Sequence, residues 1–295
     1  MGNMRVMAAA LALLVLALGP AFAADAPVAP TVPAVVAVGT DTDKAGLERD
    51  VDKLLALTEV DVDLAFIHDG EVRLLEAGKD NGAIPKVSWP YLDDALKTAF
   101  APARLKRIVR QSFIAHIDPV QLPGMLAWYG SDLGRKITAA QNSVLNRAGE
   151  KELFAYRDNP QSAPPGETRL KILRQIDGLT QTSVNHDLIL QNMQKIFVDG
   201  FTFYKKNSAA DVEKISKLIA ENRAKTPQRV ILSMAFVYRE LSDDELGLLV
   251  QFLESAPGKN FIAVANLTGR ALWADVHNNH LLLMMGQMIG KLDPP

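Results

Sequence analysis

Two histidines near the C-terminus have a spacing that suits metal chemistry. His277 and His280 lie three positions apart, shortly after Asp275. Side chains at this spacing on a helix can converge on one metal ion, but a tight site takes a third and a fourth ligand. The sequence has no HExxH motif and no second histidine cluster. We therefore expect neither a metal nor another cofactor, and we interpret His277 and His280 as part of a polar, solvated helix face.

Nucleophilic catalysis is the second chemistry that the residue types suggest. Ser131 and Ser255 stand at matching places in two similar segments, but no histidine stands at a matching place in both. The dipeptides His68-Asp69 and His186-Asp187 do not pair, because adjacent residues on a helix do not face each other. No GxSxG, phosphate-loop or dinucleotide-binding glycine pattern is present. The sequence therefore assigns no catalytic residue and favours binding over catalysis.

A basic face is the first of two surface patterns that suggest binding. It consists of Arg104, Lys106, Arg107 and Arg110 on one predicted helix. We interpret it as a solvated face opposite the core. A weak attraction for anionic lipid headgroups or peptidoglycan is the alternative.

Methionines near the C-terminus form the second pattern. Met284, Met285 and Met288 fall along one face of an apolar helix. Methionine-rich faces fill cores, and they also occur at adaptable binding surfaces. We interpret this face as core, and contact with a partner protein is the alternative.

Composition narrows the function further. The chain has 295 residues, of which 48% are hydrophobic and 22% are charged. These values exclude a polytopic membrane protein and a disordered chain. The 32 Lys and Arg residues are balanced by 34 Asp and Glu residues, so no basic excess points to nucleic acid as a partner. The absence of cysteine removes disulfides, thiolate catalysis and iron–sulfur clusters.

The N-terminal residues are typical of an export signal. Arg5 precedes the apolar run 6–18, and Ala21 and Ala23 present the small residues that signal peptidase accepts. Because the run is shorter than the roughly 20 residues that cross a bilayer, residues 1–23 are predicted to be a cleavable signal peptide. The protein is then periplasmic, is cut after Ala23, and keeps no transmembrane segment.

Beyond a Pro- and Ala-rich tether at 24–43, the hydrophobic spacing is that of helices. No stretch alternates with period two beyond a few residues, so the fold class is predicted to be all-α. Asp118 and Ser242 each begin a pattern typical of a capping box, with Gln or Glu three residues later. Asp69-Gly70 is typical of a turn and predicts a turn-rich segment before residue 90.

A Pro-rich linker at 159–166 divides the helical region into domains 44–158 and 167–295, which we interpret as tandem copies. The two capping patterns lie 124 residues apart, and three motif residues recur at the same offset. Both copies are predicted to form a helix corner, in which the serine caps a second helix and the glycine avoids crowding the first. The pairs are Trp128 and Phe252, Ser131 and Ser255, and Gly134 and Gly258.

The aromatic-x-x-Ser-x-x-Gly-Lys/Arg corner resembles the signature of a bacterial family of exported proteins. This family is known only as the domain of unknown function numbered twenty fifty-nine. The resemblance covers roughly residues 105–155 and 229–285. It implies an exported helical domain that needs no cofactor, and it carries over no catalytic residue.

The sequence therefore predicts a periplasmic protein of two tandem helical domains that acts as a non-catalytic binding or interaction module of the envelope. Its partner is unknown; an envelope protein and a lipid are the candidates, and nucleic acid is not. Two other functions remain open. One is a carrier that holds a lipid or another apolar ligand between helices. The other is an envelope hydrolase whose site is not visible in the sequence.

Overall fold

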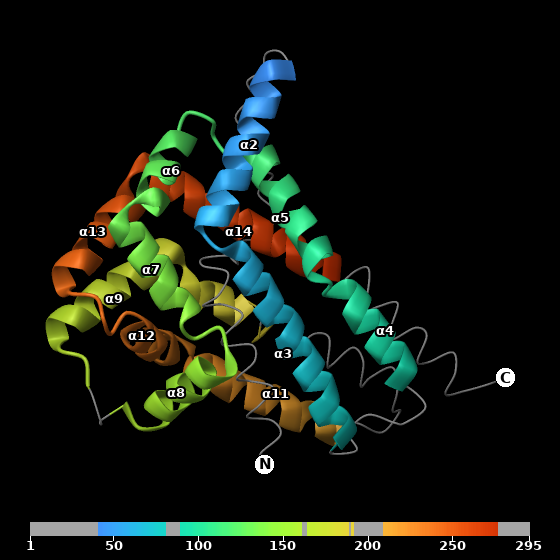
Figure 1. Ribbon diagram of the computed structural model, residues 1–295. Coiled ribbons are helices and arrows are strands. Elements are labelled where there is room, and N and C mark those ends of the chain that lie inside the picture. Colours follow the sequence, from blue (N-terminus) through green and yellow to red (C-terminus); the bar gives the residue numbers. More distant parts are fainter. Residues whose placement is uncertain (1–40, 81–88, 161–163, 189, 192–208, 277–295) are drawn as a thin grey trace.

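The computed structural model describes residues 41–80, 89–160, 164–188, 190–191 and 209–276. These residues form α-helices joined by short connections, with no strand among them, which confirms the all-α prediction (Figure 1). In chain order the helices are α2 (Asp41–Leu57), α3 (Val60–Asp80), α4 (Trp89–Ala99), α5 (Pro102–His116), α6 (Leu122–Gly130), α7 (Asp132–Asn142), α8 (Arg147–Asp158), α9 (Glu167–Thr180), α11 (Ala209–Ala224), α12 (Thr226–Val237), α13 (Asp243–Glu254) and α14 (Ala256–Val276). Residues 182–188 are also helical.

Several predictions from the sequence lie outside the described residues. They are the signal peptide 1–23, most of the tether, the metal candidates His277 and His280, and the methionine face of Met284, Met285 and Met288. The end of the tether is corrected, because α2 begins at Asp41 rather than after residue 43.

The packing of the helices repeats in the two halves of the chain. In the first half α2 contacts α5 and α6, and α6 contacts α7. In the second half α9 contacts α12 and α13, and α13 contacts α14. These contacts join helices that correspond at an offset of about 124 residues.

The buried side chains form two clusters, and each cluster takes side chains from both halves. Core one is built on α2, α3, α5 and α6, and α14 adds Val264, Ala265 and Leu272. Core two is built on α9, α12 and α13, and the first half adds Phe66, Ile137, Val144, Leu145 and Leu153.

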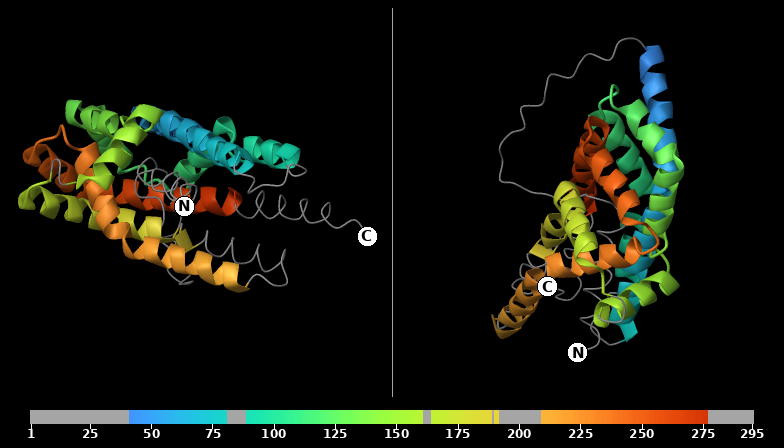
Figure 2. Two further views of the ribbon diagram at one scale, coloured as in Figure 1. Left: turned by 90° about the horizontal axis from the view of Figure 1, so that it is seen from below. Right: turned by 90° about the vertical axis from the view of Figure 1, so that its left-hand side faces the viewer.

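Helix α14 connects the two halves, because it packs against helices of both. It packs along α5 and α6, and it lies between the layer of α2 to α5 and the layer of α11 and α12 (Figure 2). The linker at 159–166 therefore divides the sequence without separating the cores.

Only one of the two predicted capping boxes forms. Ser242 Oγ accepts from the backbone N–H of Glu245 at 3.1 Å, and Glu245 Oε2 accepts from the N–H of Ser242 at 2.7 Å. Asp118 instead accepts from the N–H of Val120 at 2.9 Å, and α6 begins four residues later at Leu122. The N–H of Asp118 donates to Asn260 Oδ1 on α14 at 3.0 Å. A side chain from the other half thus takes the place that Gln121 would have in a capping box.

The basic face on α5 is a set of ion pairs between helices. Lys106 reaches Asp61 at the start of α3 at 2.6 Å, and Arg110 reaches Asp52 on α2 at 2.6 Å. Arg104 pairs with Asp275 near the end of α14. Three of the four cations are therefore matched by acids of this chain, and Arg107 is exposed without an ion pair among the described residues.

Candidate functional site

The two motif corners have the same local geometry. Ser131 Oγ accepts from the N–H of Gly134 at 3.0 Å and donates to the carbonyl of Trp128 at 2.6 Å. Ser255 Oγ accepts from the N–H of Gly258 at 3.2 Å and donates to the carbonyl of Phe252 at 2.5 Å. Each serine therefore caps the following helix and closes the preceding one. Among the described residues neither serine has a histidine partner, which agrees with a structural role.

Glycine is required at both corners by close packing of the backbone. A Cβ atom at Gly134 would overlap the carbonyl oxygen of Trp128, and a Cβ atom at Gly258 would overlap that of Phe252. The first turn of each second helix lies directly on the last turn of the first. This contact fixes the direction in which the aromatic residues of the corner point.

The corners bring aromatic rings together between the two cores. Trp128 and Phe252 stack face to face, with ring centroids 4.5 Å apart and planes 2° from parallel. Tyr129 meets Phe252 edge to face at 5.8 Å and Phe261 at 4.8 Å. Phe261 continues to Phe113 at 6.0 Å. An aromatic network thus runs from α13 through α6 and α14 to α5.

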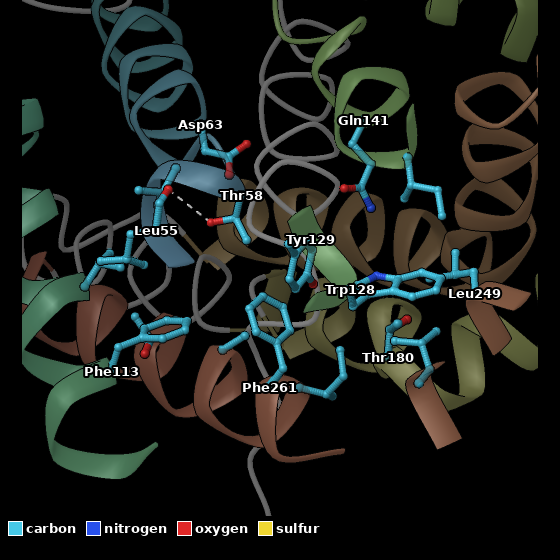
Figure 3. A pocket seen from close by; sticks show the side chains of 18 of the residues that line it. Leu55, Thr58, Asp63, Phe113, Trp128, Tyr129, Gln141, Thr180, Leu249 and Phe261 are labelled. Atoms are coloured by element: carbon cyan, nitrogen blue, oxygen red, sulfur yellow. Dashed lines mark hydrogen bonds between the residues drawn. The ribbon is translucent and has the colours of Figure 1, made fainter. Parts of the chain in front are cut away.

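A cavity of about 110 Å³ lies beside this network (Figure 3). Its lining comes from both halves and includes Thr58 and Thr180, which correspond at an offset of 122 residues. The aromatic side chains in the lining are Phe113, Trp128, Tyr129, Tyr238 and Phe261. The polar ones are Thr58, Asp63, Gln141, Thr180 and Thr268.

Most polar groups of the lining are paired within the protein. Gln141 Nε2 donates to Tyr238 Oη at 2.9 Å. The hydroxyls of Thr58, Thr180 and Thr268 donate to Leu55 O, Ile176 O and Ser112 Oγ at 3.2, 2.8 and 2.8 Å. Burial raises the pKa of the phenols of Tyr129 and Tyr238, so both stay neutral.

Asp63 differs from these groups because its buried Oδ1 atom has no hydrogen-bond partner among the described residues. The residue is 8% exposed, and its Oδ1 atom is buried without a hydrogen bond. Burial, with a smaller contribution from the negative charge of Glu59, raises the pKa of Asp63 well above its ordinary value. Among the described residues that line the cavity there is no Lys, Arg or His. The protonated, neutral carboxyl is therefore the form that this lining favours.

We predict that Asp63→Asn stabilises the protein at neutral pH. An acid with a raised pKa binds its proton more tightly in the folded state, so wild-type stability falls as pH rises from the unfolded-state pKa toward the folded one. The neutral amide removes this loss without changing the size of the side chain. In urea unfolding between about pH 4 and pH 8, the variant should gain on wild type as the pH rises.

Asp69→Asn is the matched control, because Asp69 is exposed on the same helix. It should show no growing difference over this pH range. An Asp63→Asn variant that is no more stable than wild type at pH 8 would mean that Asp63 is ionised and satisfied in the folded protein.

The two His-Asp dipeptides form no dyad. The Nδ1 atom of His68 lies 3.0 Å from the carbonyl oxygen of Phe100, so the ring bonds to the backbone. His186 is buried, with Nδ1 3.3 Å from Thr226 Oγ1, and burial beside two arginines lowers its pKa to about 4. Asp187 pairs with Arg223 at 2.6 Å instead. In the described part of the chain, no three acidic or histidine side chains gather as metal ligands would.

Reasoning from the sequence found the corner residues and missed the cavity. Asp63, Gln141 and Tyr238 lie far apart in the chain, and no motif joins them. The available signal was Asp63 itself, an acid three residues after Val60 and one before Leu64 on an otherwise apolar helix face.

Comparisons with protein-family models, with curated proteins and with solved structures find no match for this chain. Among the described helices, none is both long and apolar enough to cross a membrane.

Proposed function

We propose that this chain is an exported, periplasmic binding protein related to the family numbered twenty fifty-nine, and that the cavity between its two cores is its ligand site. The observation that carries the proposal is the cavity itself, because a mostly apolar space with a few polar groups is typical of small-molecule sites. The helix corners of the sequence motif position the aromatic wall of the cavity, which consists of Phe113, Trp128, Tyr129 and Phe261.

The volume favours a small ligand over a lipid. A cavity of roughly 150 Å³ in another protein takes up benzene, and this one is about 110 Å³. An acyl chain of a dozen carbons needs several times that space. The apolar-carrier alternative is therefore narrowed to a molecule of about the size of benzene.

The described lining residues form no hydrogen-bonded nucleophile–base pair, which the hydrolase alternative needs. The hydroxyls of the three lining threonines donate to carbonyl or hydroxyl oxygens rather than to a base. A general base within reach of a nucleophile is what such a reaction needs.

The test is binding of small probes to wild type and to a variant with a filled cavity. Ala265 is buried in the lining on α14, and Ala263 is exposed on the same helix. Benzene and tert-butanol serve as neutral probes and tert-butylammonium as a charged one. Binding is followed by Trp128 fluorescence in a background where Trp89 and Trp273 are Phe.

We expect at least one probe to bind wild type, to keep binding Ala263→Leu and to lose binding to Ala265→Leu. The added side chain occupies the cavity in the second variant only. Binding that survives Ala265→Leu would place the ligand elsewhere, and a failure of all three probes to bind wild type would reject the cavity as a ligand site.

A further inference from the structure

Asp63 is the lining residue that best indicates the chemical class of the ligand. A buried carboxyl without a partner is costly, because it loses hydration and gains no hydrogen bond or ion pair in return. Asp63 is more than nine-tenths buried, and its Oδ1 atom has no partner among the described residues. Its neighbours Val60 and Leu64 are apolar core residues. Asp63 also lies in the first turn of α3, where the positive end of the helix favours a carboxylate.

The surroundings of Asp63 suit a positive charge. Glu59 stands one turn before it and adds a second negative charge. The Glu59 carboxylate is exposed on the surface and accepts from Asn142 Nδ2 at the end of α7 at 2.6 Å. The described lining contains no cation that could neutralise either acid.

The aromatic wall faces the same space. Trp128, Tyr129, Phe113 and Phe261 line the cavity, and Figure 3 shows Tyr129 and Phe261 at its centre with Asp63 at its upper edge. Indole and phenol faces attract cations, and an aromatic lining is a common way to hold an alkylated ammonium group. Phe252 stacks on one face of Trp128 and holds that ring in place.

We propose that the ligand is a small alkylammonium cation, with its charge on Asp63 and its alkyl groups against the aromatic rings. This inference rests on the proposed function and adds the chemical class of the ligand. It accounts for a buried acid and several aromatic rings around one space of benzene size. An ion pair with the ligand would supply the partner that Asp63 Oδ1 lacks among the described residues.

The decisive comparison is between tert-butylammonium and tert-butanol. The two probes have the same shape and differ in an ammonium or a hydroxyl group, and each has one non-hydrogen atom fewer than benzene. We expect the ammonium to bind wild type at least about tenfold more tightly. Asp63→Asn should reduce its affinity to that of the alcohol, while the affinity for the alcohol stays within about twofold.

The pH dependence gives an independent readout. The ammonium group of the probe stays protonated between about pH 5 and pH 8. Among the groups around Asp63, Tyr129 and Tyr238 stay neutral, and Glu59 is exposed on the surface. Because ligand binding needs an ionised Asp63, the affinity of wild type for the ammonium should rise with pH, and that of Asp63→Asn should not.

The outcomes distinguish the ligand class from the proposed function. If tert-butanol or benzene binds as tightly as tert-butylammonium, or if Asp63→Asn leaves the ammonium affinity unchanged, the cation proposal is wrong and the cavity remains a site for neutral ligands. If no probe binds, both proposals fall. Circular dichroism and a thermal melt of Asp63→Asn establish that the variant is folded, which its predicted gain in stability favours.

Discussion

Separate expression of the two halves, residues 24–160 and 161–295, should give two chains that do not fold alone and that fold when they are mixed. The reason is the exchange of side chains between the cores. Without α14, core one loses Val264, Ala265 and Leu272. Without the first half, core two loses five residues, among them Ile137 and Leu153.

The expected loss in the free energy of unfolding is comparable to the stability of a typical domain. Burial of one Val, Leu or Ile side chain contributes roughly 1.5–3 kcal/mol. Core two loses four of them, or about 6–12 kcal/mol, and core one loses Val264 and Leu272, or about 3–6 kcal/mol. A whole domain is stable by about 5–15 kcal/mol. Each half alone should therefore show no cooperative thermal transition by circular dichroism.

A chain cut after folding is the control. A protease site inserted after Pro160 should be cleavable while the two fragments stay together in gel filtration. A cooperative transition in either half alone would contradict the shared cores and would support the two independent domains that the linker suggests in the sequence.

The local parts of this fold could be predicted from the sequence, since their causes lie within a few residues. A capping serine, a glycine three positions later and an aromatic residue three before it determine the corner at Ser131 and at Ser255. The helical spacing of apolar residues likewise determines the all-α class.

Predictions failed where residues distant in the chain decide the structure. The turn expected at Asp69-Gly70 lies inside α3, where Gly70 is buried and Phe66 and Ile67 pack into the cores. Packing of these residues outweighs the local turn preference. Asn260 from α14 likewise replaces the expected partner of Asp118. No local pattern indicates which core a helix packs into. Neither the side chains that each half contributes to the other half's core nor the cavity between the cores could therefore be predicted.

Replacement of Gly258 by alanine should destabilise the protein by roughly 3 kcal/mol, at the upper end of the cost of overpacking. The new Cβ atom would overlap the carbonyl oxygen of Phe252 and approach the Cα atom of Leu253. Both are backbone atoms of the preceding helix, so no side-chain rotation relieves the overlap. Relief requires α13 and α14 to separate, which also weakens the cap at Ser255.

Gly247→Ala is the matched control, because Gly247 lies within α13 and a Cβ atom there meets nothing within 4 Å. Alanine is the better helix former, so this variant should gain roughly 0.5–1 kcal/mol. Opposite signs in urea unfolding would assign the effect to the corner rather than to glycine in general. Because Phe252 stacks on Trp128, Gly258→Ala should also shift the fluorescence of Trp128 in the folded state, and Gly247→Ala should not. Equal stability of the two variants would mean that the corner does not hold the aromatic wall of the cavity in place.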